Sequence, residues 1–349
     1  MRKMFHFSVV LLMLLILARA DLVMKYTKDA ITMCYDFIIP SLFPFFVCSG
    51  LLVYSGFGDV LARYLQKVMV PVFNISPIGA TPFVLGIISG FPTGAVYTVE
   101  LCKSQKLSKD EAQRLLAFCN NSGPLFLIGT VGCAIYGKII YGVILYVIHI
   151  ISSVIVGIIF SGRKKDRIKS RDTAKKEAPP LGNAVAMSIN SASRSIITVC
   201  FSIIFFSAIS RTILDLLNLS PTINSIVSGL CEFSSGVFRV SELDFNIAYK
   251  LTLTSFIVGF SGLCVHLQIM AVTEKSGLSL KPYILGKALH GVIAGILTAV
   301  AMIFANKRAF AIPHTIPVLS ASFTVWVLTI SVSVCVLIAS AFLIRKKLS

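Results

Sequence analysis

The sequence predicts an all-α polytopic membrane protein with about eight transmembrane helices and two re-entrant hairpins, arranged as an inverted-topology repeat. Three observations lead to this fold class. Hydrophobic residues make up 56% of the 349 residues and charged residues only 13%, so there are too few polar side chains to cover a soluble domain of this length. Several apolar runs reach the roughly 20 residues that a helix needs to span a membrane. Finally, the two halves of the chain carry similar regions interrupted by Gly, Ser and Pro.

Seven or eight apolar segments meet or approach the length of a membrane span. They are about 5–24, 30–55, 115–136, 139–161, 196–217, 251–273, 283–305 and 322–344. Two further apolar pieces, about 72–99 and 222–238, are broken by Pro or by Gly and Ser, and we expect them to form re-entrant hairpins. Broken backbone is tolerated at membrane depth only where it is buried in protein or lines a watery cavity.

The distribution of Lys and Arg orients the chain. Arg2 and Lys3, the basic run 163–176 and the basic tail 345–347 are all expected in the cytoplasm. The predicted order is an N-terminal helix or signal anchor (1–24), a first repeat (30–161), a basic cytoplasmic linker (162–182), a second, inverted repeat (183–305), and a C-terminal helix with its tail (322–349). A cleaved signal peptide is an alternative for residues 1–20.

The composition also limits which ligands and partners the protein is expected to bind. The net charge of +17 is explained by orientation and by contact with anionic lipid headgroups, so no nucleic-acid partner is expected. The nine cysteines are scattered, with no Cys-x-x-Cys pair and no Cys/His cluster, so the sequence predicts neither a disulfide nor a metal site. We expect no cofactor, while coupling to protons or sodium ions stays open. The oligomeric state is also open.

The interrupted regions are similar in the two halves. A short broken apolar piece (88–95, then 230–237) precedes a longer one that is broken at Ser-Gly (118–125, then 259–264). Paired, interrupted hydrophobic segments in the two halves indicate the binding site of a transporter. Because half-helix N-termini present free N–H groups and a partly positive dipole end, they favour an anionic substrate.

The candidate substrate-binding residues come from these four pieces. In the first half they are Pro92, Thr93, Gly94, Asn120, Asn121, Ser122 and Gly123; in the second half they are Glu232, Ser234, Ser235, Gly236, Ser261, Gly262, His266 and Gln268. Pro124 is expected to break its span near Asn121, since the residue before a proline avoids the helical region. The alternative for any single Gly or Ser is close helix packing.

Several ionisable residues lie within apolar segments. Glu232 either lies near the site, where it would bind a coupling proton or sodium ion, or it lies at a watery mouth or pairs with a nearby base such as Arg239. His266 either binds substrate or forms an interhelical hydrogen bond. Other expectations concern residues away from the site: Lys287 extends to the cytoplasmic face, Arg211 pairs with Asp215, and His149 and His290 lie far from a break.

The motifs resemble a known family. Gly90–Ala95 (GFPTGA) and Asn120–Gly132 (NNSGPLFLIGTVG), together with Pro40–Phe45 and the Gly-Phe-Ser-Gly motif at 259–262 with His266 and Gln268, resemble the sporulation integral membrane proteins of the YlbJ type. The resemblance covers about residues 30–300 and implies membership of the nucleoside-recognition, or Gate, group of membrane domains. It further implies an endospore-forming bacterium and movement of dipicolinic acid across the outer forespore membrane toward the developing spore.

The sequence is compatible with three functions. The first is a carrier that works by alternating access of one repeat against the other. The second is an intramembrane serine protease, because Gly-Phe-Ser-Gly at 259–262 matches a rhomboid-type motif and His290 lies on the next helix. The third is a structural or assembly protein of the forespore envelope that moves no solute. We expect the carrier, because a lone nucleophile does not explain why the Ser-Gly break recurs at Ser122-Gly123.

Overall fold

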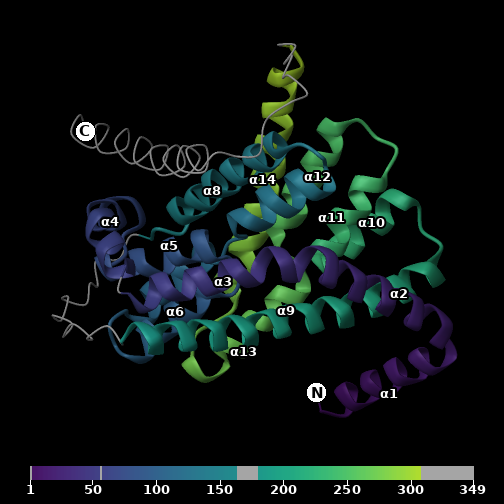
Figure 1. Ribbon diagram of the computed structural model, residues 1–349, viewed down its shortest axis with the longest axis horizontal. Helices are drawn as coiled ribbons and strands as arrows, with labels where there is room; N and C mark the ends of the chain where they lie inside the picture. Colours follow the sequence, from purple (N-terminus) through teal and green to yellow (C-terminus); the bar gives the residue numbers. More distant parts are fainter. Residues whose placement is uncertain (1, 56, 163–179, 308–349) are drawn as a thin grey trace.

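The computed structural model describes residues 2–55, 57–162 and 180–307, and over these residues the chain consists of helices and loops without a strand (Figure 1). This agrees with the predicted all-α class. Most of the basic linker, the predicted span 322–344 and the basic tail lie outside the described residues. Whether residues 1–20 are cleaved, and where each repeat begins and ends, stay predictions.

The N-terminal part runs as a series of closely spaced helices. These are α1 (Arg2–Ala18), α2 (Ala20–Met33), a π-helical turn η1 (Cys34–Ile38), α3 (Ile39–Tyr54) and α4 (Phe57–Phe73). The predicted boundary of a first span at residue 24 was wrong. The break falls at Arg19, whose backbone leaves the helical region (φ −127°, ψ 41°), and the next helical run then continues from Ala20 to Leu52.

The first hairpin and the first broken span lie in the next part of the chain. The elements are η2 (Pro77–Gly79), α5 (Ala80–Ser89), α6 (Thr93–Lys103), α7 (Lys109–Cys119), η3 (Leu125–Ile135) and α8 (Ile139–Ile159). The predicted hairpin 72–99 corresponds to α5 and α6, which meet at Gly90–Pro92. The break predicted near Asn121 is confirmed, because α7 ends at Cys119 and η3 begins at Leu125.

The second half repeats this order of elements. It comprises α9 (Leu181–Leu217), α10 (Pro221–Cys231), α11 (Phe233–Glu242), α12 (Ile247–Phe260), α13 (Gly262–Thr273), η4 (Glu274–Ser276) and α14 (Lys281–Lys307). The predicted hairpin 222–238 is α10 and α11, and the predicted span 251–273 is broken at Ser261. Helix α9 begins fifteen residues before the predicted 196, because its serines are compatible with a helix. Ser188, for instance, donates its hydroxyl to the Ala184 carbonyl at 2.7 Å.

Five described helical segments are long and apolar enough to cross a membrane, or six if the bent pair Lys67–Phe73 and Pro77–Ser89 counts as one span. They are Ala20–Leu52, Ile139–Ile159, Leu181–Leu217, Ile247–Thr273 and Lys281–Phe304. The polytopic all-α class is therefore supported, whereas the count of eight spans is not reached in the described residues. The broken helix α7–η3 accounts for part of the difference, since neither piece alone has the length of a span.

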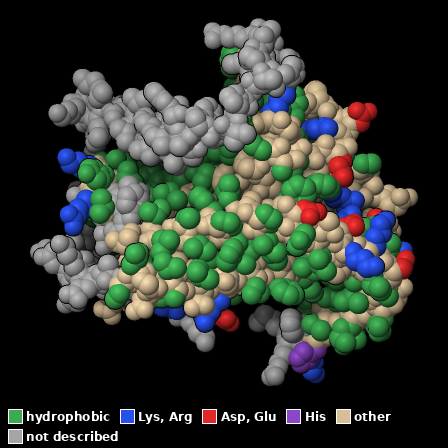
Figure 2. Space-filling model, viewed as in Figure 1, with side chains coloured by type: hydrophobic (Ala, Val, Ile, Leu, Met, Phe, Trp, Pro, Cys, Tyr) green, Lys and Arg blue, Asp and Glu red, His purple; other side chains and the backbone are tan. Residues whose placement is uncertain are grey.

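Helices α3 and α9 pack against each other across the middle of the molecule. In Figure 1, α3 and α9 run across the molecule in contact with each other, with α4, α5 and α6 toward one end and α10 and α11 toward the other. Figure 2 shows many hydrophobic side chains over the middle of this face, with most charged side chains toward the right of the view and a few others at the left and lower edges. On α9, Ile197, Phe201 and Phe205 are each at least half exposed, which suits contact with lipid.

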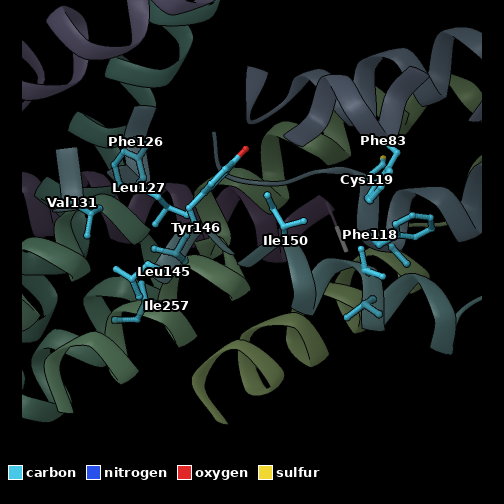
Figure 3. Packing of buried hydrophobic residues seen from close by; sticks show 14 of the residues in the cluster. Phe83, Phe118, Cys119, Phe126, Leu127, Val131, Leu145, Tyr146, Ile150 and Ile257 are labelled. Atoms are coloured by element: carbon cyan, nitrogen blue, oxygen red, sulfur yellow. The ribbon is translucent and has the colours of Figure 1, made fainter. Parts of the chain in front are cut away.

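The interior is packed with apolar and aromatic side chains. Phe118, at the end of α7, contacts Phe73 and Phe83, with ring centroids 4.8 and 5.3 Å apart. Figure 3 shows Phe118 beside Phe83, while Phe126, Leu127 and Val131 of η3 form a second group near Leu145 of α8. This packing holds the residues on both sides of the α7–η3 break in place, and the break forms part of the candidate site.

Candidate functional site

The tips of the two hairpins meet in the middle of the molecule. Phe91, at the tip of α5–α6, contacts Phe233, the first residue of α11, with ring centroids 5.7 Å apart. Phe233 also contacts Phe126 of η3 at 5.1 Å. Both contacts are edge-to-face, an arrangement that aromatic rings favour. Elements far apart in the sequence therefore converge at one point.

Each hairpin tip rests against the helix break of its own half. Gly90 has φ +78°, and a Cβ there would lie 2.9 Å from the Gly123 nitrogen. Gly262 has φ +71°, and a Cβ there would lie 3.1 Å from the Phe233 nitrogen. Glycine adopts positive φ without steric cost and lets two backbones approach closely. In both halves, a glycine with positive φ thus allows the backbone of the tip to contact the backbone of the break.

Two of the predicted site glycines lie at close helix contacts, Gly94 between α6 and α7 and Gly236 between α10 and α11. A Cβ on Gly94 would lie 2.1 Å from the Cys119 carbonyl oxygen, and one on Gly236 would lie 2.1 Å from the Gly229 Cα. These positions hold helices in backbone contact, as small residues do between membrane helices. Neither glycine faces the space between the tips.

A small cavity lies where the two tips meet the first helix break and the broken helix α12–α13. Its volume is about 40 Å³, enough for a few water molecules. Both tips, both broken helices, α3 and α9 contribute to its wall. Five predicted site residues line it: Ser122, Gly123, Glu232, Ser234 and Gln268. The other ten do not: Pro92, Thr93, Gly94, Asn120, Asn121, Ser235, Gly236, Ser261, Gly262 and His266. Their assignment to substrate stays a prediction.

Glu232 is fully buried and caps a helix. Its carboxylate accepts hydrogen bonds from the backbone N–H groups of Ser234 (2.9 Å) and Ser235 (2.7 Å), the first turn of α11. The expected pairing with Arg239, or a position at a watery mouth, was wrong. A carboxylate at a helix N-terminus is stabilised by free N–H groups and by the helix dipole, so Glu232 needs no cation. The anion site expected at this half-helix is already filled by the chain's own carboxylate.

The serines around Glu232 differ in their partners. The Ser235 hydroxyl donates to, or accepts from, the Ser207 hydroxyl of α9 at 3.0 Å, which ties the second hairpin to that long helix. The Ser234 hydroxyl lines the cavity and is buried with no hydrogen-bond partner among the described residues. Buried polar groups are normally satisfied, so an unpaired hydroxyl facing a cavity is available to a ligand or a water.

The break at 120–123 is held by its own amides and by a histidine. The Asn121 side-chain N–H donates to the Phe118 carbonyl at 2.9 Å, and the Asn120 side-chain N–H reaches the Tyr283 hydroxyl at 3.5 Å. The Ser122 backbone N–H donates to Nε2 of His149 at 3.0 Å. In both asparagines the side-chain oxygen is buried without a partner in the described part of the chain. The break therefore retains two unused acceptors.

Sequence reasoning missed a buried cluster beside this break. The expectation that Lys287 extends to the cytoplasmic face was wrong, because its side chain is fully buried and Nζ donates to the Asn120 carbonyl (3.1 Å) and to Nδ1 of His290 (3.2 Å). The expectation that His149 and His290 lie far from a break was also wrong, since their rings are 4.3 Å apart beside Ser122. The i,i+3 spacing of Lys287 and His290 on one face of α14 was the signal available in the sequence.

The break at Ser261 is arranged differently. Nδ1 of His266 donates to the Gly262 carbonyl at 2.7 Å, and its Nε2 is buried without a partner among the described residues. The ring of His266 packs against Phe260 and Tyr283. The Gln268 amide donates to the Cys264 sulfur at 3.6 Å and lines the cavity. His266 therefore lies beside the cavity wall, and Gln268 forms part of it.

Two other expectations about side-chain pairs were tested. Arg211 pairs with Asp29 of α2 at 3.0 Å, and Asp215 accepts a hydrogen bond from the Tyr26 hydroxyl. The expected Arg211–Asp215 pair was wrong, because α2 packs along α9 and supplies a partner to each residue. For the protease interpretation, the Ser261 hydroxyl bonds to the Val258 carbonyl, while His290 bonds to Lys287 and His149. The Ser–His hydrogen bond that would activate the serine is not present in this arrangement.

Comparison with known proteins points to the same family as the sequence motifs. The chain is similar to the sporulation integral membrane protein YlbJ of Bacillus subtilis (strain 168), with 28% identity over 77% of this chain and 75% of that protein. No family model and no solved structure matches the chain. Similarity over about three quarters of both chains supports a sporulation integral membrane protein of the YlbJ type, the family that the sequence motifs resemble.

Proposed function

We propose that this protein is a carrier that moves a small anionic solute, dipicolinic acid, across the outer forespore membrane toward the developing spore. The observation that carries the proposal is the cavity that both hairpin tips, the first helix break and the broken helix α12–α13 line together. Transporters built from paired repeats hold substrate at such a junction, where broken helices supply polar groups at membrane depth. The identity of the solute rests on the resemblance to the YlbJ-type proteins, which are also the reason to propose the Gate type of membrane domain.

The cavity wall suits a flat aromatic acid once the cavity is enlarged. Phe91, Phe126 and Phe233 offer ring faces or edges for stacking, and Ser234 and Gln268 offer polar groups. At about 40 Å³ the cavity holds only a few waters, so an aromatic dicarboxylate requires the tips to separate. In the described conformation the cavity is therefore too small for the proposed substrate.

The breaks supply the hinges for such a movement. Ser261 and Gly262 have φ values of 75° and 71°, and residues 120–123 connect α7 to η3 as a non-helical segment. Hinges in proteins are a few residues at element ends that absorb large changes in φ and ψ. Rocking of one half against the other about these points would open the cavity to each side of the membrane in turn.

Uptake of radiolabelled dipicolinic acid into proteoliposomes tests the proposal. We expect saturable uptake and counterflow exchange by the purified protein, with a response to a proton or sodium gradient. Protein-free liposomes, and liposomes holding protein denatured before reconstitution, are the controls. Folded protein that gives neither uptake nor exchange under any gradient would overturn the carrier and favour a non-transporting role in sporulation.

A further inference from the structure

We propose that Lys287 is a proton-binding residue that couples movement of the anion to a proton gradient, with His290 and His149 holding it beside the helix break. This inference rests on the proposed carrier function and adds to it the coupling ion and the residue that binds it. It follows from the burial of the cluster, the direction of its hydrogen bonds and its position between the two halves of the chain.

Lys287 is a buried amine without a paired acid. Its side chain is fully buried, and among the described residues no carboxylate forms an ion pair with it. The Asn120 carbonyl that accepts its hydrogen bond follows the C-terminal end of α7, the partly negative end of that helix. The Phe91 ring lies 5.3 Å from Nζ, within cation–π range. These groups favour a positive charge on Lys287 without neutralising it.

The hydrogen bonds fix both histidines as neutral. Nε2 of His149 accepts the Ser122 N–H, so that nitrogen carries no proton. Nε2 of His290 donates to the His149 carbonyl at 3.0 Å, while its Nδ1 accepts from Lys287. In this arrangement each ring keeps one proton, and His149 cannot become doubly protonated without losing the bond from Ser122. Lys287 can gain or lose a proton while its bonds to Asn120 and His290 are kept.

Among the described residues, the titratable groups that interact with Lys287 supply no negative charge. They are Cys119 of α7, His149 of α8 and His266 of α13, together with His290 of α14 itself. Glu232, the carboxylate of the cavity, is bound to two N–H groups of α11. An ammonium buried among these groups lacks a counter-charge, and an isolated buried charge is costly.

An anion in the cavity would supply the missing counter-charge. Phe91 is the residue that Lys287 shares with the cavity, since its ring centroid lies 5.3 Å from Nζ and the residue lines the cavity wall. An anion there favours the protonated amine, and by linkage the protonated amine favours the anion to the same degree. In this step a proton from water joins the lone pair of Nζ, and it returns to water on the other side when the anion leaves. Anion and proton thus move together.

The cluster also spans the two halves that must move. Asn120, Ser122 and His149 belong to the first half, and Lys287 and His290 to the second. Movement of one half against the other breaks or remakes the Lys287–Asn120 and His290–His149 bonds. The group that binds the proton therefore lies at the surface that opens and closes, as coupling requires.

Two transport measurements test the proposal. The wild-type protein is expected to exchange dipicolinate across proteoliposomes and to accumulate it faster under an inward proton gradient. Lys287→Met should lose the stimulation by the gradient and exchange dipicolinate more weakly, because it lacks the charge that favours the anion. The permanently charged Lys287→Arg should also lose the stimulation, and it serves as the test if the Met variant fails to insert. Lys281→Met, which removes an exposed lysine from the start of the same helix, should behave as wild type. A full response to the proton gradient in either Lys287 variant would overturn the proposal.

A third measurement does not depend on the substrate. Lysine labelled with ¹⁵N in the detergent-solubilised full chain reports the charge of each amine by NMR, and the resonance lost in Lys287→Met identifies Lys287. We expect this resonance to report a change of charge across the physiological pH range. A Lys287 that keeps one charge state throughout would overturn the coupling role. If the wild type exchanges no dipicolinate yet Lys287 titrates, the carrier assignment for that solute fails while the proton site stands.

Discussion

Glu232 illustrates how one residue can be identified from the sequence and still have an unexpected environment. An acid within an apolar segment indicates a functional or paired group. The sequence cannot tell which partner such an acid takes, because that depends on how the chain turns at the hairpin. Here Glu232 ends α10 in an extended conformation (φ −144°, ψ 111°) and caps the helix that follows. The partner is the backbone two and three residues ahead.

The first prediction concerns this cap. Glu232→Ala removes two hydrogen bonds to the first turn of α11 and should destabilise the protein by roughly 1 kcal/mol or more. Glu232→Gln keeps an acceptor oxygen and should lose less. Thermal unfolding in detergent measures both. Ser220→Ala, at the exposed N-cap of α10, where the capping bond is 3.5 Å long, is the matched control and should shift unfolding less. Equal melting of Glu232→Ala and the wild type would contradict the capping role.

The second prediction concerns the tip of the first hairpin. Gly90→Ala should destabilise the protein by on the order of 1–3 kcal/mol, because a side chain strains the backbone at φ +78° and a Cβ would lie 2.9 Å from the Gly123 nitrogen. Gly137→Ala is the matched control: Gly137 has φ +67° but nothing within 4 Å of its Cβ position. The difference in unfolding temperature between the two variants isolates the tip-to-break contact. If the two variants melt alike, that contact contributes nothing.

At the scale of elements, the interruptions in the sequence predicted more than the apolar runs did. Gly, Ser and Pro placed both hairpins and both breaks, because these residues act on the local backbone. The buried cluster was missed, since whether Lys287 points to water or to the interior depends on helices distant in the sequence. The same reason explains Arg211, whose partner Asp29 lies on α2. Helix breaks can be predicted from a single sequence because they depend on neighbouring residues. The pairing of helices that are distant in the sequence cannot be predicted in this way.

The third prediction tests whether the two hairpins separate during transport. Phe91 and Phe233 meet at the tips, with ring centroids 5.7 Å apart. In a background without native cysteines, Phe91→Cys with Phe233→Cys should accept a short, reducible thiol crosslinker, and the link should stop dipicolinate exchange until it is reduced. Each single cysteine variant, treated in the same way, is the control. Exchange that continues in fully linked protein would mean that the tips stay together throughout the cycle.

At the scale of the whole molecule, a carrier and a scaffold make different demands on the same fold. A scaffold requires only that the helices pack and present a surface. A carrier also requires breaks at membrane depth, which cost stability unless buried groups satisfy them. The α7–η3 break is satisfied by Asn121, His149 and Lys287 from three different elements. A scaffold does not need an interrupted helix or the buried hydrogen bonds that satisfy it. These hydrogen bonds therefore favour a carrier in which the break takes part in a movement.

The fourth prediction separates these two roles. Asn121→Ala removes the bond to the Phe118 carbonyl, and Ser261→Leu places a larger side chain at a fully buried position with φ 75°. Both should abolish dipicolinate uptake into proteoliposomes while the protein still inserts. In sporulating cells that lack their own relative of this protein, both should lower the dipicolinate content of spores. Asn183→Ala, at an exposed position on α9, is the control and should support normal uptake and content. A scaffold would tolerate all three substitutions once the protein accumulates, so normal spores from the two site variants would exclude the carrier.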